Sequence, residues 1–370
     1  MVANEMMLKG KEVDTERALK SKLISKRKLI QLPQWGVAWL ALFPALIFLT
    51  LFMMYPIVNT FLSAFVQRYN YTEGAGSFAI GQFIAGITRG GVNESFGLSN
   101  FKIALTNPEF LASIGNTAIL VIIEVPLTII VSLLIATFLN SIKVLKGFYQ
   151  TIFFLPYVTN SIALGLVFNI VFSENPGGLM NILITKFGGD PINWLSARPS
   201  SYVESQMIEG GASKFHQGVV IVLFSLWNGI AFKILVFMSG LATIDSQYYN
   251  AAKIDGASNF TIWRRITLPL LSPQILYITI TSFIGAFKMY SGVMAVYSYI
   301  PPHFTGTNSG YYFGGDEGKD WTPVVGWIYR ELDNNPDQIG VPSAASLVLL
   351  AIIMVITAVQ FGVSKKRVHY

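Results

Sequence analysis

Six long apolar stretches constrain this chain more than any other feature of its sequence. Each is long enough to cross a hydrocarbon core of ~30 Å, which takes roughly 20 helical residues. The composition agrees, since 52% of the residues are hydrophobic and 12% are charged, against roughly 25% charged residues in a soluble domain. The sequence therefore predicts an all-α polytopic membrane protein with about six transmembrane helices. The spans are expected near residues 37–65, 112–139, 149–172, 217–241, 273–299 and 343–363.

The basic residues predict how these spans are oriented. With the amino terminus in the cytoplasm, the tail 1–36, loop 140–148, loop 242–272 and the tail 364–370 all lie on the cytoplasmic side. These segments hold 16 of the 26 Lys and Arg residues, and the external segments hold 8. Such an excess marks the cytoplasmic side, so both termini are expected there and residues 37–363 form the transmembrane domain. The expected external loops are 66–111, 173–216, with a short interfacial helix at 180–187, and 300–342.

Several kinds of chemistry have no residues to support them. The chain has no cysteine, and its three histidines are too far apart for a metal site. Gly318-Lys319 lacks the spacing of a phosphate-binding loop, and no nucleophile is paired with a base. The basic run 26–28 precedes the first span, so it is interpreted as a membrane flank and not as a nucleic-acid site. We expect no catalytic residue, no metal and no cofactor in this chain.

One polar segment, Asn250–Pro273, separates the fourth and fifth spans and reads NAAKIDGASNFTIWRRITLPLLSP. Gly256 accepts the left-handed backbone that closes a helix, and Asp255 or Ser258 is suited to cap the next one. Pro269 is expected to stop that second helix. The segment therefore predicts two short helices set at an angle, with an apolar tip and a basic rim.

This segment resembles the EAA loop of the permeases of binding-protein-dependent ABC importers. The matching residues are Ala251, Ala252, Asp255, Gly256, Ala257, Ile266, Leu268, Pro269 and Pro273, while Asn250 replaces the leading Glu of the pattern. The first span, FFLPYV at 153–158 and Asn-Trp-Leu at 193–195 are similar to the F-type permease subunits of maltose and lactose importers. The usual Thr-x-Gly-Gly-Pro after the fifth span is absent, so the resemblance does not extend over loop 300–342.

The resemblance implies a type I ABC importer permease of the MetI-like fold in the cytoplasmic membrane of a bacterium or archaeon. The subunit itself is then no enzyme, because ATP and Mg bind to two partner ATPases. A second permease subunit completes the path, and an extracytoplasmic solute-binding protein delivers a sugar. Asn250 can form hydrogen bonds but no ion pair with an ATPase. The implied ATPase-coupling residues are Asn250, Ala251, Ala252, Asp255, Gly256, Ala257, Phe260, Arg264, Leu268 and Pro269.

The substrate path is expected at the middle of the fourth and fifth spans. Sugars need hydrogen-bonding groups beside flat apolar faces, because their hydroxyls are polar while their C–H faces stack on aromatic rings. The resemblance places the site at Ser225, Asn228, Gly229 and Phe232, and at Gly285, Ala286 and Met289; their neighbourhood adds Trp227, Phe287, Lys288 and Tyr290. The alternative is that Asn228 and Tyr290 are interhelical hydrogen-bond partners.

Three charged residues lie within the expected spans: Glu124, Lys233 and Lys288. If both lysines face the path, the substrate is an acidic oligosaccharide, because a buried ammonium favours a carboxylate. In the alternative, Lys233 extends to an interface and Lys288 pairs with Glu124. The EAA-type segment also leaves open a permease for polyamines, phosphate or glycerol phosphate. A stand-alone secondary transporter would need an ion-coupling site or repeated halves, and the sequence shows neither.

Overall fold

The computed structural model describes residues 34–66, 97–142, 144–173, 177–195, 214–297, 321–335 and 338–364. Helices are the regular elements of these ranges, which contain no β-strand. The basic amino-terminal tail, the carboxy-terminal tail from residue 365 and the middle of each expected external loop lie outside the described residues. The chain divides into two compact units, residues 1–60 and residues 61–370.

The described part of the first unit is one long apolar helix. It comprises α2 (Gln34–Leu49), the π-helical turn η2 (Thr50–Met54) and the start of α3 (Tyr55–Phe65). The Tyr55 N–H bonds to the Thr50 carbonyl five residues earlier, which widens the turn just before Pro56. Because Pro56 has no N–H to offer, this wider turn lets the helix continue past it. The stretch Ala38–Phe65 is long and apolar enough to cross a membrane.

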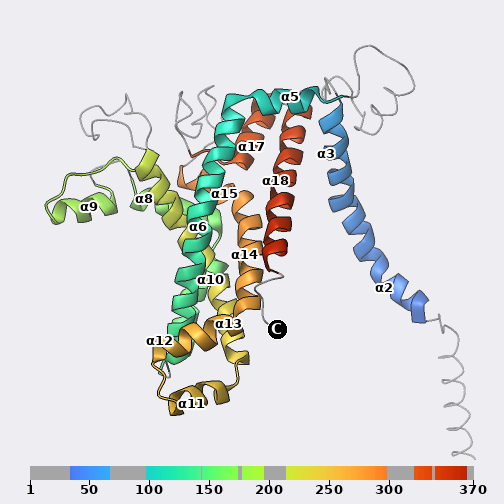
Figure 1. The fold of residues 1–370 in the computed structure, drawn as a ribbon. Helices are drawn as coiled ribbons and strands as arrows, with labels where there is room; N and C mark the ends of the chain where they lie inside the picture. Colours follow the sequence, from blue (N-terminus) through green and yellow to red (C-terminus); the bar gives the residue numbers. More distant parts are fainter. Residues whose placement is uncertain are drawn as a thin grey trace, which may run out of the picture. The chain divides into compact units, whose positions relative to one another are not determined.

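Three unbroken helices form the frame of the second unit: α6 (Pro108–Ser141), α10 (Lys214–Thr243) and α18 (Gly340–Ser364). The Asn107 side chain caps α6 by accepting hydrogen bonds from the amides of Glu109 and Phe110 at 2.9 and 3.1 Å. Figure 1 shows α6 and α10 side by side, and they share the most extensive helix contact. With Ala38–Phe65, these are four helices of membrane-spanning length and hydropathy among the described residues.

The third expected span is broken, which corrects the continuous stretch 149–172. Helix α7 (Lys146–Val158) and helix α8 (Ser161–Val171) meet at 98°. Pro156 removes a hydrogen bond from the last turn of α7, and the Asn160 side chain accepts from the Ile162 amide at 2.8 Å to start α8. Counting this pair and a second bent pair described below as one span each, the described residues hold six candidate spans.

The fifth expected span, 273–299, is also interrupted. Helix α14 (Ser272–Phe287) ends before a short non-helical break, after which α15 (Ser291–Val296) begins. Packing accounts for the change of direction, because α15 lies so close to α8 that a Cβ on Gly165 would come within 2.7 Å of the Gly292 carbonyl oxygen. The Asn169 side chain also donates to the Val296 carbonyl at 2.8 Å. A close helix contact thus overrides the apolar continuity of the sequence.

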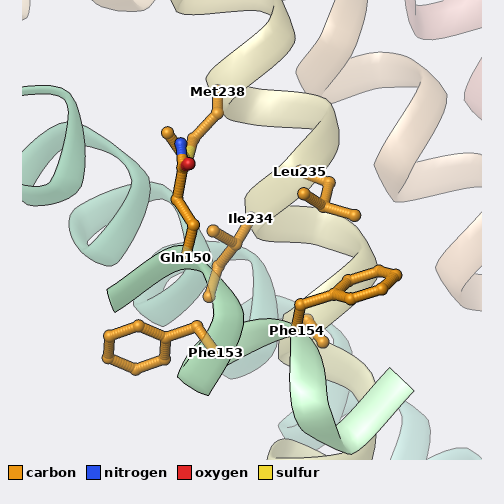
Figure 2. A pocket seen from close by; sticks show the side chains of 7 residues that line it. Gln150, Phe153, Phe154, Ile234, Leu235 and Met238 are labelled. Atoms are coloured by element: carbon orange, nitrogen blue, oxygen red, sulfur yellow. The ribbon is translucent and has the colours of Figure 1, made fainter. Parts of the chain in front are cut away.

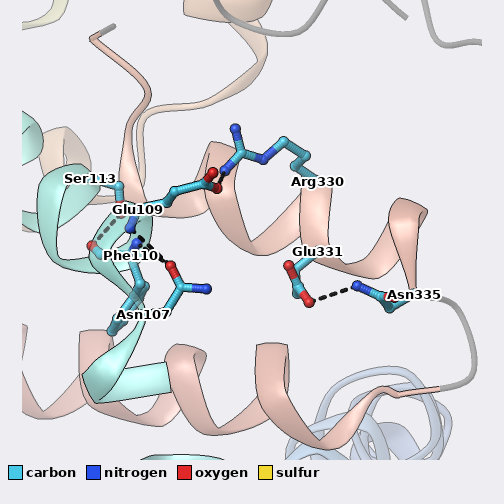
Figure 3. Close-up of polar contacts among 7 residues, drawn as sticks. All are labelled: Asn107, Glu109, Phe110, Ser113, Arg330, Glu331 and Asn335. Atoms are coloured by element: carbon cyan, nitrogen blue, oxygen red, sulfur yellow. Dashed lines mark hydrogen bonds and ion pairs between the residues drawn. The ribbon is translucent and has the colours of Figure 1, made fainter. Parts of the chain in front are cut away.

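Parts of the expected external loops are helical: α5 (Ser99–Thr106), α9 (Leu179–Lys186) and α17 (Val324–Asn334). Figure 3 shows that Arg330 of α17 forms an ion pair with Glu109 in the first turn of α6. Beneath it, the rings of Phe110 and Trp327 lie 4.8 Å apart, and both side chains are fully buried. Helix α17 therefore packs firmly on the end of α6 rather than lying in an open loop.

The segment after α10 folds into four short helical pieces, which we call the knob: α11 (Ser246–Ile254), α12 (Asn259–Ile262), the π-helical η3 (Trp263–Thr267) and α13 (Leu268–Leu270). Gly256 has φ +74°, and the Ala257 amide donates to the Ala252 carbonyl at 2.9 Å, which closes α11. The Ser258 hydroxyl accepts from the Thr261 amide at 3.2 Å and caps the next helix. Figure 1 places the knob at the end of the bundle opposite α5 and α17.

Pro269 does not stop the second helix of the knob, contrary to the sequence expectation. The Leu268 N–H bonds to the Trp263 carbonyl five residues earlier, so a wide turn again precedes the proline. The helix instead bends by 66° at Leu271, where it passes into α14. Leu271 is fully buried against Phe237 and Ile278, and this core contact fixes the bend.

Candidate functional site

The knob presents apolar side chains to its surroundings. Ile254 is 87% exposed, Phe260 67% and Tyr248 57%. Exposed side chains of this size, gathered on a small helical unit, are typical of an interaction surface. Two hydrogen bonds brace the unit from inside: Trp263 Nε1 donates to the Thr137 hydroxyl of α6 at 3.4 Å, and the hydroxyls of Tyr249 and Thr267 are 3.3 Å apart. The knob is thus fixed to the bundle while its tip remains uncovered.

The residues predicted to couple to an ATPase come together in the knob. Those on its surface are exposed, and the remaining ones are partly buried where the knob meets the core. Exposed are Asn250, Ala251, Asp255, Gly256, Phe260 and Arg264, and partly buried are Ala252, Ala257, Leu268 and Pro269. The Phe260 ring also stacks on Trp263, with centroids 6.1 Å apart, so its direction is set by a braced neighbour.

A polar seam lies between α6 and α10. Ser225, Gly229 and Lys233 follow one another at one-turn intervals along α10. Lys233 is 8% exposed, and its ammonium folds back to donate to the Gly229 carbonyl at 3.2 Å. Across the seam, Glu124 of α6 interacts electrostatically with Lys233. Its second carboxylate oxygen, Oε2, is buried and accepts no hydrogen bond.

The seam agrees fully with neither of the two interpretations of the charged residues. Glu124 has Lys233, and not Lys288, as its electrostatic partner. Lys233 does not extend toward a helix end either, because its ammonium returns to the turn before it. Gly229 makes room for this arrangement, since a Cβ at that position would lie 3.0 Å from Lys233 Nζ. Glu124 and Lys233 thus interact across the seam without forming a direct ion pair.

The predicted site residues near the end of α14 divide into packed and exposed side chains. Ala286 and Phe287 are 6% and 5% exposed and belong to the core shared with α6, α17 and α18. Lys288, in the break, is exposed. The Met289 sulfur lies 3.6 Å from the Ser225 hydroxyl, and the Tyr290 ring stacks on Tyr329 of α17 at 4.3 Å. The break is thus held on both sides of Lys288.

Aromatic side chains gather on the uncovered face of α10. Trp227 and Phe232 are 44% and 38% exposed, while Asn228 between them is partly buried. Tyr157 of α7 stacks on Phe232, with centroids 5.9 Å apart and planes within 22°, and is itself 54% exposed. The sequence reasoning did not select Tyr157, although it lies in the FFLPYV segment. The stacked rings of Tyr157 and Phe232 thus offer flat apolar faces beside the Asn228 amide one turn earlier, which suits a sugar ring, whereas Trp227 lies about 140° around the helix from Phe232.

A small pocket between α7 and α10 does not suit a sugar. Figure 2 shows its lining, which is Gln150, Phe153, Phe154, Ala231, Ile234, Leu235 and Met238. Gln150 is the one polar residue among the seven, and its amide nitrogen donates to the Met238 sulfur at 3.7 Å. The pocket thus has one amide for the several hydroxyls of a sugar, and the aromatic face of α10 is the better candidate site.

Comparison with known families gives one match over most of the chain. Residues 128–369 match the model described as "Binding-protein-dependent transport system inner membrane component". The matched region includes α10, the knob, α14 and α18. It therefore covers the knob and the aromatic face of α10.

Similar proteins include permeases of sugar transport systems. The arabinooligosaccharides transport system permease protein AraP of Bacillus subtilis (strain 168) is 28% identical over 330 residues, which is 87% of this chain and 86% of the relative. The lactose transport system permease protein LacF of Rhizobium radiobacter is 26% identical over 333 residues, 89% and 94% of the two chains. The sn-glycerol-3-phosphate transport system permease protein UgpA of Agrobacterium fabrum is 26% identical over 281 residues, 76% and 84% of the two chains.

A solved structure shares the fold. It is the crystal structure of a bacterial ABC transporter involved in the import of the acidic polysaccharide alginate. One of its chains superposes with a TM-score of 0.66 at 16% sequence identity, covering 89% of this chain and 95% of that one. The predicted all-α permease fold is thereby confirmed.

Proposed function

This chain belongs to the family of binding-protein-dependent transport system inner membrane components, and we propose that it is a permease subunit of an ATP-driven importer of oligosaccharides. The family match over residues 128–369 carries the proposal. The named relatives for arabinooligosaccharides and lactose support sugar as the cargo. The aromatic face of α10 agrees, because stacked rings beside Asn228 supply both kinds of contact that a sugar needs.

The knob is the proposed contact with a cytoplasmic ATPase. Its exposed tip, with Ile254 and Phe260, enters a cleft of the ATPase, and its braced base transmits the movement to α6 and α14. Closure of two ATPases around ATP and Mg then reorients the two permeases as rigid bodies. The knob end and both termini accordingly face the cytoplasm. This subunit performs no covalent chemistry and binds no nucleotide in this proposal.

The opposite end of the bundle is the proposed docking side for an extracytoplasmic solute-binding protein. A bacterial alginate ABC transporter with the same fold has been solved in complex with an alginate pentasaccharide-bound periplasmic protein, which supports a partner of this kind. A second permease subunit completes the path, and the uncovered face with Trp227, Phe232 and Tyr157 is the part that this chain contributes.

Uptake by a deletion strain tests the proposal. Cells that lack this gene are compared with cells that carry it on a plasmid, with radiolabelled arabinotriose, lactose and sn-glycerol 3-phosphate as the probes. The proposal predicts that the deletion strain fails to take up at least one of the two sugars and that the plasmid restores this uptake. Loss restricted to sn-glycerol 3-phosphate would favour the other solute class, which the relative named for that compound represents.

A further inference from the structure

The two intramembrane lysines have different surroundings. Lys233 is accounted for, because its buried ammonium bonds to the Gly229 carbonyl and interacts electrostatically with Glu124. Lys288 is exposed, and no carboxylate of the described residues lies within ion-pair distance of it. Within a membrane an ammonium that is neither buried nor paired cannot face lipid tails, so it requires water or an anion. The seam thus leaves one lysine whose charge is not neutralised within the described part of the chain.

The backbone around Lys288 is held in place. Phe287 on one side is anchored in the core. On the other side, Met289 contacts Ser225, and Tyr290 stacks on Tyr329. Figure 1 shows that α14 stops part way along α6, so the break lies within the length of the bundle. Lys288 is therefore displayed from a fixed position inside the expected span and does not belong to a loose terminal turn.

The break contacts the helix that carries the candidate sugar site. Met289, the residue after Lys288, contacts Ser225 of α10, which lies three residues before Asn228. An ammonium there adds a charged donor to a surface that otherwise offers aromatic faces and an amide. Charge-assisted hydrogen bonds to a carboxylate are about twice as strong as neutral ones, so this donor favours an acidic sugar over a neutral one.

The geometry points to Lys288 as a specificity-determining residue that binds a carboxylate of an acidic, uronate-type oligosaccharide in the path. This inference rests on the proposed function, since it names the class of sugar that the importer takes. Lys233 is buried and donates to the Gly229 carbonyl, so Lys288 is the exposed one of the two lysines within the expected spans. A carboxylate on the second permease subunit is the competing partner for Lys288, and the experiment separates the two.

Uptake kinetics of the complete transporter in cells test the inference, with trimannuronate as the acidic probe and arabinotriose as the neutral probe. Lys288→Met should lower the ratio of kcat to KM for trimannuronate by about tenfold or more, the size expected when a hydrogen bond to a charged group is lost. Uptake of arabinotriose should stay within about twofold. Lys288→Arg keeps the charge and should recover most of the trimannuronate uptake.

Three results would overturn the inference. An equal loss for both sugars in Lys288→Met would assign Lys288 to a structural pair with the second permease. Uptake of arabinotriose but not of trimannuronate by the wild-type transporter would refute the inference while leaving the proposed function standing. Uptake of neither of these two sugars would also refute the inference, while the proposed function would still be decided by its own test with lactose.

A labelling experiment covers the case in which Lys288→Met does not assemble. The chain has no cysteine, so Gly285→Cys introduces a single thiol one turn before an intact Lys288, at an exposed position where a Cβ has open space. Membrane-impermeant thiosulfonate reagents should label this thiol, and trimannuronate should protect it more than arabinotriose does. No labelling, or equal protection by the two sugars, would contradict the inference.

Discussion

The knob and the α6–α10 seam place side chains in opposite ways. At the knob, apolar side chains such as Ile254 and Phe260 are exposed, and the caps that shape it come from neighbours two or three residues away. In the seam, charged side chains are buried, and their partners come from a helix far away in the sequence. Each arrangement is costly in isolation. The comparison teaches that the knob is built for contact with another protein, whereas the seam is closed within this chain.

The largest effect is expected from Gly256→Pro in the knob. Gly256 has φ +74°, which proline cannot adopt, so the turn between α11 and α12 must rearrange. Uptake should fall to background while the amount of protein in the membrane stays near the wild-type level, as immunoblots of membranes would show. Gly362→Ala is the matched control, because a Cβ there meets no atom within 4 Å. Uptake at the wild-type level by Gly256→Pro would show that transport does not depend on the shape of the knob.

Glu124→Gln should damage the seam itself. It removes the carboxylate that interacts with the buried ammonium of Lys233, and because the two groups form no direct ion pair, the free energy of unfolding should fall by about 1–3 kcal/mol. The double variant Glu124→Gln with Lys233→Met removes both charges and should recover most of this loss. Thermal unfolding of the purified transporter in detergent measures all three proteins. Additive losses in the double variant would mean that the two charges are not coupled.

Phe260→Ala tests whether an exposed side chain of the knob serves binding to the ATPase and not the stability of the chain. Phe260 is 67% exposed, so truncation should leave the unfolding temperature almost unchanged. Binding to the ATPase should weaken by about 2 kcal/mol, the lower limit for a residue that dominates an interface. Pull-down titration of the ATPase by the detergent-solubilised permease measures this loss. If the variant is as stable as the wild-type permease and binds the ATPase equally well, the exposed ring does not contact the ATPase.

A smaller effect is expected from Gly229→Ala. In an ordinary helix position this change stabilises by about 0.5–1 kcal/mol, because alanine has the higher helix propensity. At Gly229 the added methyl group meets Lys233 Nζ at 3.0 Å and should cancel that gain. Gly115→Ala in α6 is the control, since a Cβ there has open space. Unfolding temperatures that rise equally in both variants would show that the ammonium has room to move.

Features that depend on neighbouring residues could be predicted from the sequence, whereas features that depend on contacts between distant helices could not. The left-handed Gly256 and the Ser258 cap are local features, so they were predictable from neighbouring residues alone. The interaction of Glu124 with Lys233 depends on how two helices face one another, and the sequence analysis named Lys288 as the partner of Glu124 instead. The break after Phe287 depends on the packing of α15 on α8, which no apolar pattern contains.

The two prolines that follow π-helical turns show a further reason for a wrong expectation. Pro56 and Pro269 are each preceded by a residue whose N–H bonds to the carbonyl five positions earlier. The wider turn removes the conflict that normally ends a helix at proline. The rule that proline stops a helix therefore misplaced the end of the knob, which lies at Leu271 where a buried core contact bends the chain.

Cross-linking from the tip of the knob tests the central claim most directly. A photo-reactive amino acid is placed at Ile254, which is 87% exposed, or at Val355 of α18, which is 63% exposed, and cells that still take up sugar are irradiated. The account predicts that Ile254 forms an adduct with the ATPase of the transporter and that Val355 forms none with it. An active transporter in which Ile254 gives no ATPase adduct would contradict the assignment of the knob.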